Sequence, residues 1–315
     1  MIGVVGGDLK PDNVDLVLKG DKHQIGIIDF DDGGRGALIG DLLHTLVYNQ
    51  AWHVPVDTSQ ALQFYKAGLN QESNPQFVNT KVDLNEYKKR KKKFENQLEK
   101  QSKDKSNFFK SLKLIELSDL QGPQRDLFLK TSSEIKNEVL KLGRVIFEGA
   151  RTKESGGSKG VLRVTYLIRT EQNELKIIEF KHQTQAAVAM GNVTQLNHAP
   201  RLHEIKNFYR PDLMWGNILR LLETNGETFI VREKSEPIFD GQKAVKSASE
   251  RTAYEAYVYN MFFWLGYAHG AQSTGYKSFW TQNSEALEIG LVKMVQAQIT
   301  EAIQVVNSNP ESRFF

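Results

Sequence analysis

Three side chains suited to phosphoryl transfer lie close together near the start of the sequence. The segment GDLKPDNV contains Asp8, Lys10 and Asn13. Phosphoryl transfer needs a carboxylate that orients an acceptor hydroxyl and takes its proton, oxygen ligands for magnesium, and a cation near the transferring group. Pro11 fixes its own φ and biases Lys10 away from helical geometry. The segment is therefore predicted to be a rigid loop, as a preorganised site requires.

A further carboxylate follows in the segment IIDFDD, residues 27–32. Strands are expected at 14–18 and 24–30 with the turn KGDK between them, so a hairpin should bring Asp29 near the first loop. Carboxylate and amide oxygens are ligands that suit magnesium. The alternative is that Asp8 and Asn13 only cap a turn, because such residues dominate turns.

A glycine-rich segment, ESGGSKG at 154–160, directly precedes two strands expected at 161–168 and 175–181. Glycines allow backbone N–H groups to approach phosphates closely. Lys181 ends the second strand and would add positive charge in a partly desolvated place. The residues predicted to hold the phosphates of ATP are Gly156, Gly157, Ser158, Gly160 and Lys181.

These segments resemble the catalytic machinery of kinases. D-L-K-P-D-N resembles the catalytic loop of protein kinases, G-D-x-x-P-x-N that of aminoglycoside kinases, and I-D-F-D their metal-binding segment. The resemblance implies that Asp8 is the catalytic base and that Lys10 contacts the transferring phosphate. It implies that Asn13 and Asp29 bind Mg²⁺, and that Asp41 matches a structural aspartate of the small-molecule kinases.

The order of the motifs resembles a bacterial family called domain of unknown function 2252. The corresponding pieces are GDLKPDNV, IDFDD, GGSKG and FKHQ. This order implies a protein-kinase-like two-lobed fold whose lobes are permuted. By analogy with kinases, Glu204 in RLHEIKNFY is a candidate partner for Lys181; its alternative interpretation is a solvated helix carboxylate.

The elements expected around these motifs indicate an α+β fold. We expect a strand at 2–5 and helices at 40–51, 122–146, 211–223, 247–270 and 284–307, with a further strand at 228–233. Three parts are predicted: a catalytic and metal-binding part at 1–145, a β-rich nucleotide-covering part at 146–245, and C-terminal helices at 246–315 that pack on the first part. Because the best motif begins at residue 8, we expect either a missing upstream segment or an unusually short leader.

Composition narrows the possible functions. The 315 residues include no cysteine, which excludes disulfides and thiolate chemistry. No run of 18 or more apolar residues is present, so we expect no membrane span and a cytoplasmic location. The formal net charge of +3 says little about partners.

The run KKRKKK, Lys88–Lys93, leaves a nucleic-acid-associated role as one hypothesis. Its alternative is a solvated helix face, since Glu95 and Glu99 follow. The leading hypothesis is a Mg-ATP-dependent phosphotransferase that acts on the hydroxyl of an unidentified small molecule or protein. A pseudokinase-like module that binds a nucleotide or a partner without transferring phosphate is the second.

Overall fold

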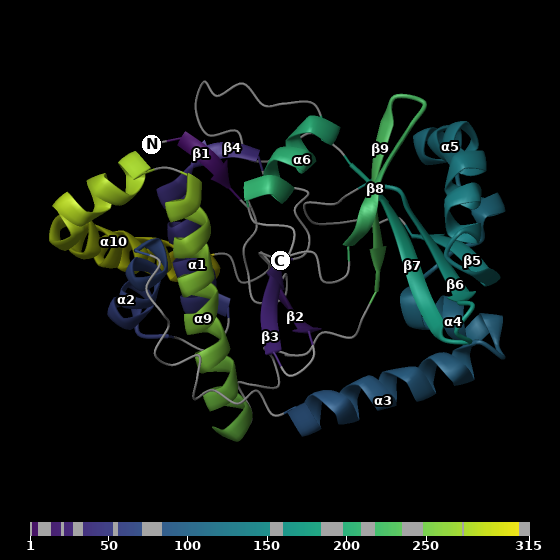
Figure 1. Cartoon of the computed structure of the whole chain (residues 1–315), viewed down its shortest axis with the longest axis horizontal. Helices are drawn as coiled ribbons and strands as arrows, with labels where there is room; N and C mark the ends of the chain where they lie inside the picture. Colours follow the sequence, from purple (N-terminus) through teal and green to yellow (C-terminus); the bar gives the residue numbers. More distant parts are fainter. Residues whose placement is uncertain are drawn as a thin grey trace.

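The middle of the chain forms a five-stranded antiparallel sheet in this computed structural model (Figure 1). The strand order is β5-β6-β7-β9-β8, which places β7 at the centre. The strands are β5 (Arg144–Arg151), β6 (Arg163–Arg169), β7 (Leu175–His182), β8 (Ile218–Thr224) and β9 (Glu227–Glu233).

The structure describes residues 2–5, 14–19, 22–27, 34–52, 56–70, 84–151, 160–183, 198–208, 218–234, 248–272 and 274–308.

Two tight turns set the register of the central strands. Asn173 has a positive φ of 64° in the turn between β6 and β7. Asn225 and Gly226, with φ of 50° and 79°, join β8 to β9. Asn-Gly is the residue pair that a two-residue hairpin turn with positive φ at both positions favours. The first turn places Arg163 opposite Lys181, and the separate pairing of β7 with β9 places Glu179 opposite Arg232.

One face of the sheet is apolar and is covered by α5 (Gly122–Leu140). Alternate strand residues such as Val164, Tyr166 and Phe180 point to this face and pack with Ile135 and Val139 of the helix. Successive side chains of a strand point to opposite faces, so the register decides which residues face α5. It also fixes which residues must point to the other face.

The opposite face changes character along its length. Near one end, Leu167 and Ile177 pack with Leu98 of α3 (Leu84–Gln101) and Phe108 of α4 (Lys105–Leu112). Further along the same strands, polar and charged side chains replace the apolar ones.

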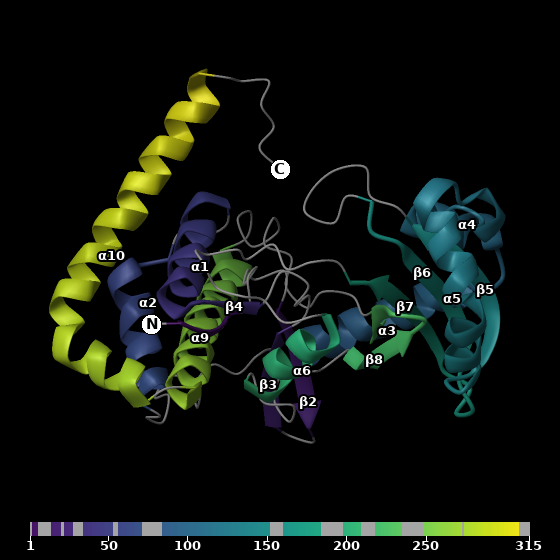
Figure 2. The same cartoon turned by 90° about the horizontal axis from the view of Figure 1, so that it is seen from above.

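Helices from both ends of the chain form a second core. The helices are α1 (Leu38–Trp52), α2 (Thr58–Leu69), α9 (Ala248–Gln272) and α10 (Thr274–Ser308). Helices α2 and α9 approach closely at glycines: a Cβ at Gly68 would overlap the carbonyl oxygen of Phe263, and one at Gly266 would overlap that of Tyr65. Figure 2 shows these helices on the side of the molecule away from the sheet.

Short elements lie between the helical core and the sheet in both views (Figures 1 and 2). They are the strand pair β1 (Ile2–Val5) and β4 (Gly34–Ala37), the hairpin β2 (Val14–Lys19) and β3 (Lys22–Ile27), and the helix α6 (His198–Phe208). The strands on either side of the segments 6–13 and 28–33 therefore lie in the middle of the molecule.

The structure confirms an α+β fold, and it bears on several of the expected elements. The hairpins 14–27 and 163–182, the strand at 227–233 and the helix at 248–272 are confirmed. The helix expected at 211–223 is wrong over 218–223, because 218–224 pairs with β9 as a strand, and residues 211–217 lie outside the described residues. The helix expected at 122–146 ends at Leu140, and β5 begins at Arg144. None of the helices described has both the length and the apolar character needed to cross a bilayer.

Candidate phosphate-binding face of the sheet

The predicted site residues divide into two groups. Three of them, Gly160, Lys181 and Glu204, fall within the described ranges. The others lie outside the described residues: Asp8, Lys10, Asn13, Asp29, Gly156, Gly157 and Ser158. Within the described residues, no group of three or more His, Asp or Glu side chains is placed to hold a metal ion.

Gly160 closes the predicted glycine-rich segment directly before β6. Its φ of 74° lies in the left-handed region, where a residue with a Cβ is strained. Its carbonyl oxygen accepts a hydrogen bond of 2.9 Å from the side-chain nitrogen of Gln124 on α5. The end of this segment is thus fastened to the helix behind the sheet.

Lys181 lies on β7, the central strand, and only 1% of its surface is exposed. Its cross-strand neighbours are Arg163 on β6 and Ile230 on β9. Its side chain points away from α5, because Phe180 beside it packs into the core on the α5 side. A lysine is rarely buried to this extent.

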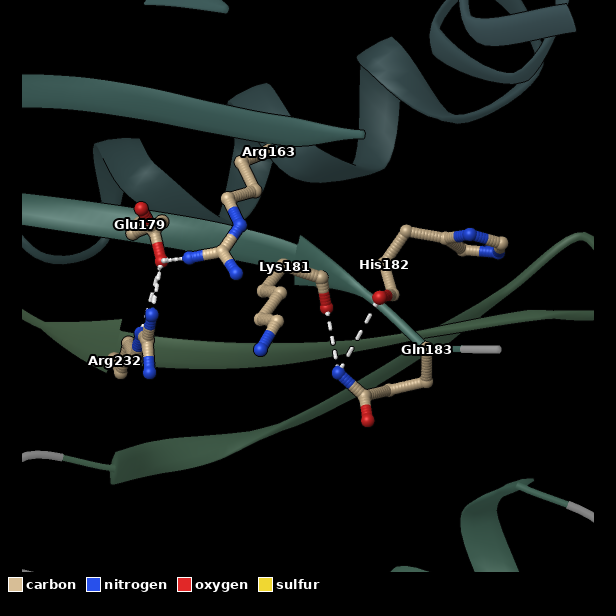
Figure 3. Close-up of polar contacts among 6 residues, drawn as sticks. All are labelled: Arg163, Glu179, Lys181, His182, Gln183 and Arg232. Carbon is tan, nitrogen blue, oxygen red and sulfur yellow. Dashed lines mark hydrogen bonds and ion pairs between the residues drawn. The ribbon is translucent and has the colours of Figure 1, made fainter. Parts of the chain in front are cut away.

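Lys181 belongs to a charged group on this face (Figure 3). Glu179, also 1% exposed, lies two residues before it on β7. The Glu179 Oε1 atom accepts hydrogen bonds from Arg232 Nη2 at 2.6 Å and Nε at 2.9 Å, and from Arg163 Nη1 at 3.4 Å. One carboxylate therefore holds two guanidinium groups that come from the strands on either side of β7.

The positive charges keep this carboxylate ionised. Burial alone raises the pKa of Glu179, but the attraction of Arg232, then of Arg163 and Lys234, outweighs burial and lowers the pKa. Lys234 directly follows β9. Burial is the largest cause of the lowered pKa of its amine, and nearby arginines add to the effect while Glu179 opposes it. The polar face therefore concentrates positive charge around one carboxylate among the described residues.

Gln183 extends the same row along β7 and is completely buried. Its side-chain nitrogen donates hydrogen bonds to the carbonyl oxygens of Lys181 at 3.1 Å and His182 at 3.4 Å. Because both partners can only accept, the amide nitrogen must face them and the amide oxygen must point away. That Oε1 atom has no hydrogen-bond partner, so this face also offers a buried acceptor.

Glu204 does not contact Lys181 in the described structure. Its carboxylate instead pairs with Arg35 of β4, with Oε1 at 2.9 Å from Nη2 and Oε2 at 3.1 Å from Nε. Two parallel hydrogen bonds of this kind fix the orientation of both groups. The pair therefore links β4, which follows the 28–33 segment in sequence, to α6, which follows Lys181.

Asp41, expected to have a structural role, is buried in the helical core. Its Oδ2 lies 3.7 Å from Nε2 of His269, whose Nδ1 is hydrogen-bonded to the hydroxyl of Tyr65 at 2.7 Å. Tyr65 in turn contacts the hydroxyl of Tyr276 at 2.9 Å. This buried polar chain joins α1, α9, α2 and α10, and it lies apart from the sheet.

A cavity of about 540 Å³ lies between the start of α6 and the β8–β9 turn. Glu223 and Glu227 line it, together with Thr224 and Thr228. Lys130 and then His182 hydrogen-bond Glu227 and lower its pKa, so this carboxylate is charged. Carboxylates repel phosphates, and the cavity is therefore less suited to a nucleotide's phosphates than the face that carries Lys181.

The basic run lies in the first part of α3, where Lys89, Lys91, Lys92 and Lys93 are exposed. The helix is held to the sheet by its second part, through Phe94 and Leu98. The exposure agrees with a solvated helix face and does not by itself indicate a nucleic-acid site.

Comparisons of the chain with protein-family models, curated proteins and solved structures found no significant match. The sequence interpretation missed Arg163, Glu179 and Arg232. A partial signal was present for two of them: in LKIIEFKH, Glu179 and Lys181 are two residues apart, which places both on one face of a strand, and the hairpin expected with LRVTYLIR brings Arg163 opposite that strand. Once the two strands are paired, Arg163, Glu179 and Lys181 must gather on that face.

Proposed function

We propose that this chain is a Mg-ATP-dependent phosphotransferase that transfers phosphate to the hydroxyl of an acceptor, with a kinase-like arrangement of permuted lobes. The proposal is supported most directly by Lys181. A lysine buried on the central strand of an antiparallel sheet, beside two guanidinium groups and after a glycine-rich segment in the sequence, suits the phosphates of a nucleotide.

The motif residues have separate roles in this proposal. Asp8 takes the proton of the acceptor hydroxyl, and Lys10 contacts the transferring phosphate. Asn13 and Asp29 bind Mg²⁺, which neutralises phosphate charge when it is bound. The glycine segment ending at Gly160 and Lys181 bind the ATP phosphates.

The first experiment measures binding of Mg-ATP to the full chain by calorimetry. Lys181→Met should weaken it by about 10-fold or more, since hydrogen bonds to charged groups contribute about 1.5–3 kcal/mol. Lys176→Met is the matched control, because Lys176 is on the same strand, on the opposite face, and pairs with Glu233 at 3.1 Å. Equal affinity of both variants and the wild type would contradict the proposal.

The second experiment measures phosphate transfer to a panel of hydroxyl acceptors. Asp8→Asn should lower turnover by about 10²–10⁴-fold, the usual contribution of a positioned base, with Mg-ATP affinity and thermal unfolding unchanged. If this variant unfolds, Asp8 is structural and the assignment of the base is wrong.

A module that binds Mg-ATP without transferring phosphate is the second candidate. It is favoured by one observation: the carboxylate of Glu204 pairs with Arg35, whereas the active arrangement expected by analogy pairs it with Lys181. Mg-dependent ATP binding with no turnover on any acceptor would select this candidate over the enzyme.

A further inference from the structure

The two guanidinium groups beside Lys181 are held in place by a shared carboxylate. Arg163 comes from β6 and Arg232 from β9, and both donate to Oε1 of Glu179 on the strand between them. The side chains of Arg163 and Arg232 are 6% and 13% exposed. Burial restricts the side-chain conformations of each arginine when the protein folds. Ligand binding would therefore cost little further conformational entropy.

The register places these groups within reach of one ligand. Arg163 is directly opposite Lys181, and such cross-strand neighbours have Cβ atoms about 4.5–5.5 Å apart. Glu179 is directly opposite Arg232 and two residues from Lys181 on the same face. Figure 3 shows the Lys181 amine on the same side of β7 as both guanidinium groups.

The charges on this face favour an anion with several charged groups. Like charges placed directly opposite on neighbouring strands destabilise a sheet, yet β6 and β7 place Arg163 opposite Lys181. Guanidinium groups bind phosphate oxygens through two parallel N–H donors, which a lysine amine cannot do. A ligand with adjacent phosphates would contact an amine and a guanidinium at once.

We propose that Arg163 and Arg232, oriented by Glu179, form with Lys181 one binding group for the terminal phosphates of a nucleoside triphosphate. This inference rests on the proposed function and extends it. The arginines give the site its preference for a triphosphate over a diphosphate or a monophosphate. Glu179 is a positioning residue that acts through the arginines.

The test compares affinities of the full chain for Mg-ATP, Mg-ADP and AMP by calorimetry. Arg163→Gln and Arg232→Gln should each weaken Mg-ATP binding by about 10-fold or more and AMP binding by much less, so that the preference for the triphosphate shrinks. The matched control is Arg169→Gln, because Arg169 lies on β6 at the opposite end of the strand, near Glu99 and Asn173. The control should keep the preference.

Glu179 is tested by two variants. Glu179→Gln should reduce the ratio of ATP affinity to AMP affinity, and Glu179→Asp, which keeps the charge, should restore part of it. A purely structural Glu179 would weaken all three nucleotides equally. Should Glu179→Gln not fold, Arg163→Lys and Arg232→Lys replace it: they keep the charge and remove the paired donors, and each should lower the same ratio.

The outcomes separate this inference from the proposed function. If Lys181→Met weakens Mg-ATP binding while both arginine variants keep the full preference for ATP, the inference is overturned and the proposed function stands. If inorganic tripolyphosphate binds through the arginines but ATP does not compete with it, the anion-binding group stands and the nucleotide function fails. If neither ATP nor tripolyphosphate binds the wild type, both fail.

Discussion

At the scale of single residues, the polar face of the sheet is organised around Glu179. A buried carboxylate is expensive unless it is paired, and here two arginines supply the pairing. The arrangement is stable only while the carboxylate is charged, because a neutral side chain would leave buried guanidinium groups without that counter-charge. Stability should therefore depend on this one residue more than on any exposed ion pair of the sheet.

We expect Glu179→Gln to destabilise the protein by about 3–5 kcal/mol, the usual effect of removing one partner from a buried ion pair. Urea unfolding followed by circular dichroism measures the change. Glu174→Gln is the control, since Glu174 lies in the turn before β7 with 63% of its side chain exposed and should change stability by less than about 1 kcal/mol. Equal effects of the two changes would show that Glu179 is not a structural centre.

The pH dependence of stability follows from the same carboxylate. Its pKa is lowered in the folded state relative to the ordinary value of 4.5, so the unfolded state takes up a proton more readily. The stabilisation is complete above the ordinary pKa and is lost as the pH falls through the folded pKa. Unfolding measured between about pH 3 and pH 7 should show this loss in the wild type and a smaller loss in Glu179→Gln. The same slope in both would disprove the assignment.

Residue-level chemistry could be predicted from the sequence only in part. The sequence predicts a site role for Lys181, because a glycine-rich segment precedes two strand patterns and Lys181 ends the second of them. Arg232 could not be found in the same way, because its place beside Glu179 depends on β9 pairing with β7, which are separated in sequence by β8. A contact that depends on strand order is not visible in local periodicity.

At the scale of elements, the approach of α2 to α9 depends on glycines. We expect Gly266→Ala to destabilise the protein by about 1–3 kcal/mol, because the added methyl group would overlap the Tyr65 carbonyl, which belongs to the helix backbone. Gly290→Ala is the control: Gly290 lies on α10 with no atom near the added methyl, and the change should stabilise by about 1 kcal/mol. Thermal unfolding compares them, and a harmless Gly266→Ala would mean that the helices can separate at little cost.

The wrong assignment of 218–223 as helix has a clear physical cause. The prediction of a helix at 211–223 depends on Pro211, which suits the first turn of a helix. The Asn225-Gly226 pair directly after this segment is a stronger signal, since it favours the turn that joins two paired strands. Giving this turn pair more weight than a first-turn proline would have predicted β8 as a strand.

At the scale of the whole molecule, the basic part of α3 precedes the residues through which this helix packs on the sheet. Replacing Lys89, Lys91, Lys92 and Lys93 together with glutamine should leave Mg-ATP affinity unchanged, because the helix is anchored by Phe94 and Leu98 instead. Calorimetry measures the affinity. Retention on immobilised DNA or RNA is measured alongside, and retention that falls steeply with salt in the wild type and vanishes in the variant would establish a nucleic-acid role for this run.

The pair of Arg35 and Glu204 joins the middle of the molecule to α6. We expect the coupling between Arg35→Gln and Glu204→Gln in a double-mutant cycle to be favourable at low salt and to vanish near about 1 M salt, because the pair is partly exposed. Chemical unfolding of the four proteins measures it. A coupling independent of salt would show that the two residues interact through packing.

The pairing of first and last helices has a consequence for how the protein is made. Residues of α1, α2, α9 and α10 contribute to the same core, so α1 and α2 can bury their apolar faces only after α9, which follows the sheet in sequence, has been synthesised. The sheet between them, from Arg144 to Glu233, forms a core with α5, and the buried residues of that core lie in the stretch from Leu120 to Val231. During synthesis the sheet can therefore fold first, and the exposed apolar faces of α1 and α2 are the part of the nascent chain that most needs a chaperone.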